Sequence, residues 1–176
     1  ALFVYAAFFS FAYITLDTGI GALILFACVQ ATMIGWGLVM GERPSLIAWA
    51  GILAAFCGFI YLVSPGLTAP DPFGAVLMAI SGIAWGIYSL RGRGLSNPLN
   101  ATMANFLLSV PAALLLSLVS ASAFEITTMG VIFAICSGAI TSAMGYALWY
   151  EVLKNLTATN AAVLQLTVPV IAAVGG

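Results

Sequence analysis

Residues 41–63, GERPSLIAWAGILAAFCGFIYLV, place a charged turn directly before a long uncharged apolar run. The run from 45 to 63 approaches the length of about 20 helical residues that crosses a bilayer core of about 30 Å. Because hydrocarbon offers backbone groups no water, a spanning segment must be a helix or a strand of a closed barrel. The run lacks the alternation of polar and apolar residues that barrel strands show, so it predicts a transmembrane helix.

The same pattern fills the rest of the chain. Hydrophobic residues make up 64% of the 176 residues and charged residues only 5%, whereas soluble domains carry about 25% charged residues. Together these features predict an all-α polytopic membrane protein, a bundle of transmembrane helices. The six further apolar runs lie at roughly 1–16, 18–40, 73–90, 99–119, 128–150 and 156–176.

The charges in the gaps between these runs predict the orientation. All four cations fall in alternate gaps, and the intervening gaps hold only acids. Cytoplasmic loops of membrane proteins carry the excess of Lys and Arg, so we expect the cationic gaps to be cytoplasmic. The cations are Arg43, Arg91, Arg93 and Lys154, and the acids of the outward gaps are Asp17, Asp71 and Glu125.

Composition also argues against several functional classes. The chain contains no histidine, which removes His metal ligands and Ser–His or Cys–His nucleophile pairs. Cys28, Cys57 and Cys136 lie singly inside apolar runs and predict small buried side chains rather than disulfides or metal ligands. A net charge of −1 gives no reason to expect nucleic acid as a partner. We therefore expect neither an enzyme nor a cofactor or metal site.

A weak internal repeat suggests inverted halves. An offset of 139 residues aligns the first two runs with the last two, which cross the membrane in the opposite direction. Inverted repeats of this kind are an architecture of secondary transporters. The identities are Thr18 with Thr157, Ala22 with Ala161, Leu25 with Leu164, Val29 with Val168 and Gly37 with Gly176.

Four short motifs carry a resemblance to a known family. They are GERPS at 41–45 followed by WAG at 49–51, GIAWGIYS at 82–89, YALWY at 146–150, and LQLTVPV at 164–170. In this order and spacing they resemble the drug/metabolite transporter superfamily, specifically its EamA-type exporters and permeases. The family often has proline where this chain has Gln30, while Pro169 keeps proline in the second half.

The resemblance implies ten helices in two inverted five-helix repeats around a central substrate cavity. By that comparison the chain is a fragment similar to helices three to nine, truncated at both ends. Residues 1–66 would be the end of the first repeat, and 67–176 most of the second. The implied function is a secondary exporter or permease of small organic metabolites, working by alternating access in a bacterial cytoplasmic (inner) membrane. The alternative is a channel-like or structural membrane subunit, and a homodimer stays open.

Four residues are candidates for binding the solute. Gln30 and Gln165 lie near the middle of their runs, where an amide facing lipid would leave polar groups unpaired, so we expect both to face the interior. They would either contact substrate or form hydrogen bonds that only hold helices together. Trp85 and Tyr146 would either line the cavity or pack against other helices, since aromatic rings suit an organic solute.

Other motifs favour structural roles. The GxxxG pairs Gly37/Gly41 and Gly82/Gly86 predict close helix contacts within the chain rather than a dimer. Glu42, at a helix end, suggests capping or a local ion pair rather than gating. Tyr150, beside a loop, predicts a residue of the aromatic belt at the membrane interface.

Overall fold

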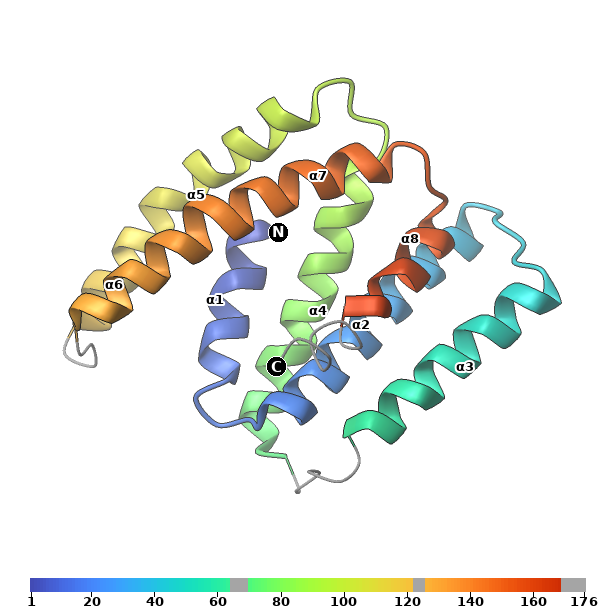
Figure 1. Ribbon diagram of the computed structural model, residues 1–176, viewed down its shortest axis with the longest axis horizontal. Helices are drawn as coiled ribbons and strands as arrows, with labels where there is room; N and C mark the ends of the chain where they lie inside the picture. Colours follow the sequence, from blue (N-terminus) through green and yellow to red (C-terminus); the bar gives the residue numbers. More distant parts are fainter. Residues whose placement is uncertain (64–69, 122–125, 169–176) are drawn as a thin grey trace. The chain divides into compact units, whose positions relative to one another are not determined.

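The computed structural model describes residues 1–63, 70–121 and 126–168 (Figure 1). The predictions made for Glu125, for Pro169 and for the repeat boundary after residue 66 lie outside these residues. Within them, the regular secondary structure is helical. Among the described residues, four segments are long and apolar enough to cross a membrane: Thr18–Val39, Pro72–Gly92, Leu99–Val119 and Thr128–Leu153. The predicted all-α membrane protein is thus confirmed.

The helices follow the apolar runs. Helices α6, η3 and α7 are consecutive and together form the single long segment expected from 128 onward, with a π-helical turn at η3. The bounds are α1 (Leu2–Ala12), α2 (Thr18–Val39), α3 (Leu46–Val63), α4 (Pro72–Gly92), α5 (Pro98–Val119), α6 (Thr128–Ile135), η3 (Cys136–Ser142), α7 (Ala143–Leu153) and α8 (Ala158–Gln165).

The helices form two compact units. The first contains Phe3–Leu90 and the segment from Leu156 onward, and the second contains Arg91–Asn155. This division follows contacts in space. It is distinct from the repeat division at residues 66 and 67, which stays a prediction.

In the first unit, α2 is the central helix and packs against both α3 and α8 (Figure 1). Glycines bring α4 close to it as well. A Cβ on Gly82 would lie 2.6 Å from the Leu25 carbonyl oxygen, and one on Gly86 would lie 2.8 Å from Thr32 Cβ. The Gly82/Gly86 motif therefore makes the close intrachain contact that the sequence predicts.

At one end of this unit, Asp71 links the loop before α2 to the start of α4. Its Oδ2 accepts hydrogen bonds from Thr15 Oγ1 at 3.0 Å and from the backbone nitrogen of Gly74 at 2.7 Å. The second bond caps the first turn of α4. The loops before α2 and before α4 consequently lie at the same end, as the alternation of spans requires.

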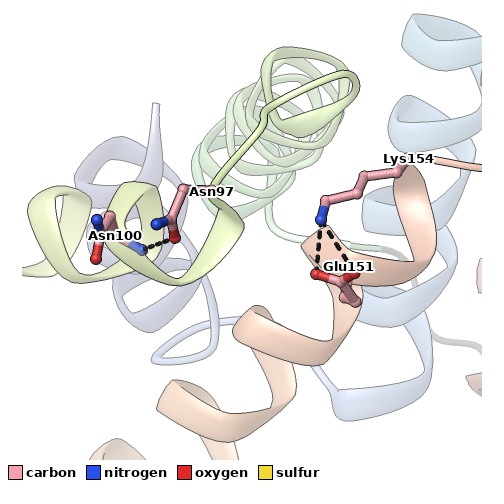
Figure 2. Close-up of polar contacts among 4 residues, drawn as sticks. All are labelled: Asn97, Asn100, Glu151 and Lys154. Carbon is pink, nitrogen blue, oxygen red and sulfur yellow. Dashed lines mark hydrogen bonds and ion pairs between the residues drawn. The ribbon is translucent and has the colours of Figure 1, made fainter.

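In the second unit, α5 lies beside α7 (Figure 1). Asn97 Oδ1 caps α5 by accepting from the backbone nitrogen of Asn100 at 3.1 Å, and Pro98 occupies the first helical position. Lys154 Nζ pairs with Glu151 at 2.9 Å at the end of α7. Figure 2 shows both contacts.

The prediction that Tyr150 belongs to the aromatic belt is wrong. Its side chain is 1% exposed, so it is a core residue of the second unit and not a belt residue. A Cβ on Gly92 would collide with the Tyr150 ring, so glycine at 92 leaves the space that the ring fills. Tyr61, at 83% exposure, and Trp49, at 37%, are by contrast exposed.

Candidate substrate site

Gln30 and Gln165 each form a hydrogen bond across the interface between α2 and α8. Gln30 Nε2 donates a hydrogen bond to the carbonyl oxygen of Ala162 at 2.6 Å. Gln165 Nε2 donates in the other direction, to Met33 Sδ at 3.1 Å, and also to the Ala161 carbonyl oxygen at 3.4 Å. Both glutamines are only 5% exposed. The prediction that both amides face the interior is confirmed.

Trp85 joins this pair from α4. Its indole Nε1 donates a hydrogen bond to Gln165 Oε1. Three helices that are distant in sequence thus contribute to one polar contact set. We call Gln30, Trp85 and Gln165, with Met33 and Tyr5, the amide–indole cluster.

Tyr5, from α1, completes the aromatic side of the cluster. Its ring centroid lies 4.8 Å from that of Trp85, and the two planes are inclined by 44°. Ser81 Oγ donates to the Tyr5 carbonyl oxygen at 2.9 Å and so fixes α1 against α4 at this level. Trp85 also stacks with Tyr88, with ring centroids 5.4 Å apart. Sequence reasoning missed Tyr5, and its place in an aromatic-rich first run was the available signal.

One polar atom in the cluster has no hydrogen-bond partner within the described structure. It is the buried side-chain oxygen Oε1 of Gln30. The Ala162 carbonyl can only accept, so the amide nitrogen must face it and the oxygen must turn elsewhere. Leaving a buried acceptor unpaired costs about 1–3 kcal/mol, so this oxygen is a place where a donor would bind favourably.

Tyr146 belongs to the second unit, where its ring stacks with that of Phe106 at 5.6 Å and an interplanar angle of 23°. The structure therefore brings together three of the four predicted site residues. The placement of Tyr146 beside them stays a prediction.

Glu42 fixes the start of α8. Its Oε1 accepts from the backbone nitrogen of Ala158 at 2.7 Å, and its Oε2 accepts from the backbone nitrogen of Thr159 at 3.0 Å and from Thr159 Oγ1 at 2.8 Å. A carboxylate satisfies orphan N–H groups there and complements the positive end of the helix dipole. The expected capping role is confirmed, but the capped helix begins 116 residues further along the chain.

The end of α2 is built to present this carboxylate. Gly41 has φ of 87°, the backbone nitrogen of Glu42 donates to the Gly37 carbonyl at 2.8 Å, and that of Gly41 donates to Leu38 at 3.1 Å. This is the Schellman arrangement that ends a helix and turns the chain back. Gly37 provides the clearance, since a Cβ there would lie 2.7 Å from Glu42 Oε2.

These contacts also show how α2 and α8 run. Glu42, three residues beyond the end of α2, contacts Ala158 at the start of α8, and Gln30, further back in α2, contacts Ala162, further along α8. The two helices are therefore antiparallel. The gap at 40–45 and residues 156–157, which lead into α8, therefore lie at one end of the first unit.

Two other features of the described residues bear on chemistry. No group of three His, Cys, Asp or Glu side chains is placed to hold a metal ion. An apolar pocket of about 260 Å³ lies apart from the predicted site residues, and none of them lines it. Its lining residues are Phe8, Phe11, Ile14, Thr15, Phe73 and Leu77.

Comparisons with known proteins agree with the resemblance. Residues 72–176 match the family model of the EamA-like transporter family. The uncharacterized protein PA1977 of Pseudomonas aeruginosa is 48% identical over 176 residues, which is 100% of this chain and 61% of that protein. An uncharacterized transporter of Archaeoglobus fulgidus is 27% identical over 178 residues, covering 94% of this chain and 60% of its own length.

The name of a third relative includes a location. The uncharacterized inner membrane transporter YedA of Escherichia coli K12 is 29% identical over 108 residues, covering 61% of this chain and 35% of that protein. No solved structure matches the chain.

Proposed function

The chain belongs to the EamA-like transporter family. We propose that it forms part of a secondary transporter of small organic solutes that works by alternating access. The observation that carries this proposal is the amide–indole cluster. Buried polar side chains within membrane spans are costly and tend to mark substrate pathways. Here two amides and an indole from three helices share one set of hydrogen bonds, and Gln30 and Trp85 lie inside the membrane-length segments Thr18–Val39 and Pro72–Gly92.

Two further observations support inverted halves. The match to the family model begins at residue 72, near the start proposed for the second repeat. The antiparallel packing of α2 and α8 fits the opposite orientation that the 139-residue offset assigns to them. In transporters with inverted repeats, the site lies at the repeat interface and opens to each side in turn.

The proposed location is a bacterial inner membrane, which is also the location in the name of the related YedA protein. We propose that the loops carrying Arg43, Arg91, Arg93 and Lys154 face the cytoplasm.

The rival classes have less support. An intramembrane hydrolase would need a histidine, a metal site or paired carboxylates within the bilayer, and this sequence has no histidine and keeps its acids in the gaps. A channel would be favoured by rings of like charges or by open carbonyl filters. A structural subunit would use the amides only to hold helices together.

Transport measurements distinguish these classes. The full-length protein, purified and reconstituted in liposomes, should show saturable uptake of organic solutes and counterflow against a preloaded unlabelled solute. Ohmic current without saturation would favour the channel. Absence of both flux and current, from a folded protein and a broad metabolite panel, would favour the structural subunit.

A further inference from the structure

We infer that two hydrogen-bonded carboxylates, Glu42 and Asp71, are latches that close the two ends of the transport path and break one at a time. This inference names the gates of the site proposed above and rests on that proposed function. Each carboxylate ties a residue of the proposed first repeat to a residue of the proposed second repeat.

The two latches have the same construction. Each carboxylate accepts hydrogen bonds from a backbone nitrogen at the start of a helix and from a threonine hydroxyl. Asp71 accepts from the backbone nitrogen of Gly74 at 2.7 Å and from Thr15 Oγ1 at 3.0 Å. Glu42 accepts from the backbone nitrogen of Thr159 at 3.0 Å and from its hydroxyl at 2.8 Å. One contact set therefore occurs twice in the first unit.

Both latches are tightly fitted over a glycine. A Cβ on Gly37 would lie 2.7 Å from Glu42 Oε2, and a Cβ on Gly74 would collide with Thr15 Oγ1. Hydrogen bonds of this type form only over a narrow range of distances, about 2.7–3.2 Å for N–H donors. A small separation of the joined segments is therefore enough to break either latch.

The latches lie at opposite ends of α2, with the amide–indole cluster between them. Thr15 precedes α2 and Glu42 follows it. The 22 residues of this helix rise about 33 Å, which is the thickness of a bilayer core. Gln30 lies near the middle of the helix. A solute bound at the cluster would therefore have one latch toward each side of the membrane.

Rocking of two repeats moves contacts apart in proportion to their distance from the pivot. Contacts close to a pivot at the central site, such as that of Gln30 with Ala162, can persist. Contacts at the ends must break when their end opens, so the Glu42 latch would open toward the cytoplasm and the Asp71 latch toward the outside. A cap within one repeat would not respond to this motion, whereas Glu42 caps a helix of the other proposed repeat.

Distances between spin labels test the latches in the full-length protein in liposomes, without the need for a solute. Labels are attached to cysteines introduced at exposed positions in a background without the native cysteines, one pair at each end. We expect a short and a long distance for each pair, because each end opens in turn. The pairs are Met40 with Asn160 and Ile14 with Val76.

Two matched variants separate the latches. Thr159→Val and Thr15→Val each replace a latch hydroxyl by a methyl group, and the remaining backbone bonds keep both helices capped. Each variant should raise the long-distance population at its own end by about threefold or more, as expected for one lost hydrogen bond. The long-distance population at the opposite end should fall. Thr141→Val is the control, because its hydroxyl donates to Ser137 within its own helix.

Glu42→Ala removes every bond of its latch and should give a larger shift than Thr159→Val at the same end. A single fixed distance at both ends, in variants that fold normally, would make the two contacts static helix caps and overturn the inference. Equal lengthening at both ends in any one variant would indicate general loosening and would overturn it as well.

The two levels of the proposal fail differently. If the distances stay fixed while organic solutes show saturable flux, the latches fail and the transporter stands. If no organic solute shows saturable flux, the proposed function fails, whatever the distances show.

Discussion

The carboxylate of Glu42 binds both the backbone nitrogen and the hydroxyl of Thr159, at 3.0 and 2.8 Å. The two residues are 117 positions apart. Their contact ties the end of α2 to the start of α8, the helix that carries Gln165. The position of a candidate substrate residue thus depends on a cap at the helix end.

Removing this cap should destabilise the protein. We expect Glu42→Ala to lower the free energy of unfolding by about 0.5–2 kcal/mol, the range measured for lost helix caps. Glu151→Ala is the control, because its pair with Lys154 is exposed and such pairs contribute about 0–1 kcal/mol. Unfolding in detergent micelles by SDS titration measures both. Equal small losses would show that the Glu42 contact contributes no more than a surface ion pair.

Gly37→Ala should act through the same carboxylate. The added Cβ would lie 2.7 Å from Glu42 Oε2 and 3.1 Å from Thr159 Oγ1, so we expect the variant to lose stability. In a Glu42→Ala background the nearer obstacle is gone and only Thr159 Oγ1 at 3.1 Å remains, so the loss caused by Gly37→Ala should become smaller, partly offset by the better helix propensity of alanine. A double-mutant cycle by SDS titration measures this coupling. Additive losses would separate Gly37 from the cap.

Gln165→Leu tests the amide–indole cluster directly, because it nearly keeps the size of the side chain and removes its hydrogen bonds. If the amide orients substrate, uptake should fall severalfold at normal membrane yield, since one hydrogen bond contributes about 0.5–1.5 kcal/mol. If it only holds helices together, yield and thermal stability should fall together with uptake.

The indole donor provides the matching variant. Trp85→Phe removes the hydrogen bond to Gln165 but keeps an aromatic ring. We expect its effect on uptake and that of Gln165→Leu to be non-additive, because both remove the same bond. Unchanged uptake at unchanged yield for both Gln165→Leu and Gln30→Leu would exclude the amides from the site.

Gly82 and Gly51 form a matched pair of helical glycines. A Cβ on Gly82 meets the backbone of α2 at 2.6 Å, whereas a Cβ on Gly51 meets nothing within 4 Å. Gly82→Ala should therefore separate α4 from α2 and lower folded yield and thermal stability. Gly51→Ala should be neutral or stabilising by up to about 1 kcal/mol. A tolerated Gly82→Ala would mean that the close approach of these helices is unnecessary.

Cysteine labelling tests the orientation. In a background where Cys28, Cys57 and Cys136 are replaced by alanine, Ala121→Cys should react with an impermeant thiol reagent from outside intact cells. Ser96→Cys should react only after permeabilisation, because its gap carries Arg91 and Arg93. Both positions are exposed, whereas a side chain at Gly92 would collide with Tyr150. Labelling of Ser96→Cys from outside would reverse the topology.

The local sequence pattern is sufficient to establish the membrane class and the long apolar helices. Charges are excluded from hydrocarbon, so the ends of α2, α4, α5 and α7 follow from where charged and turn-forming residues occur. It also determined that Gln30 and Gln165 face inward, because an amide facing lipid has no partner for its polar groups. These inferences need only the local pattern and the properties of the bilayer.

Which residues contact one another depends instead on how the helices pack. The sequence indicated a cap at Glu42 but not that Thr159 receives it, and an interior Gln165 but not that Trp85 and Met33 contact it. It assigned Tyr150 to the interface, although Gly92 leaves room to bury it. In a chain this uniformly apolar, every helix face can be buried. Small clearances at Gly37, Gly82 and Gly92 select the partners, and these become visible only when the helices are packed together.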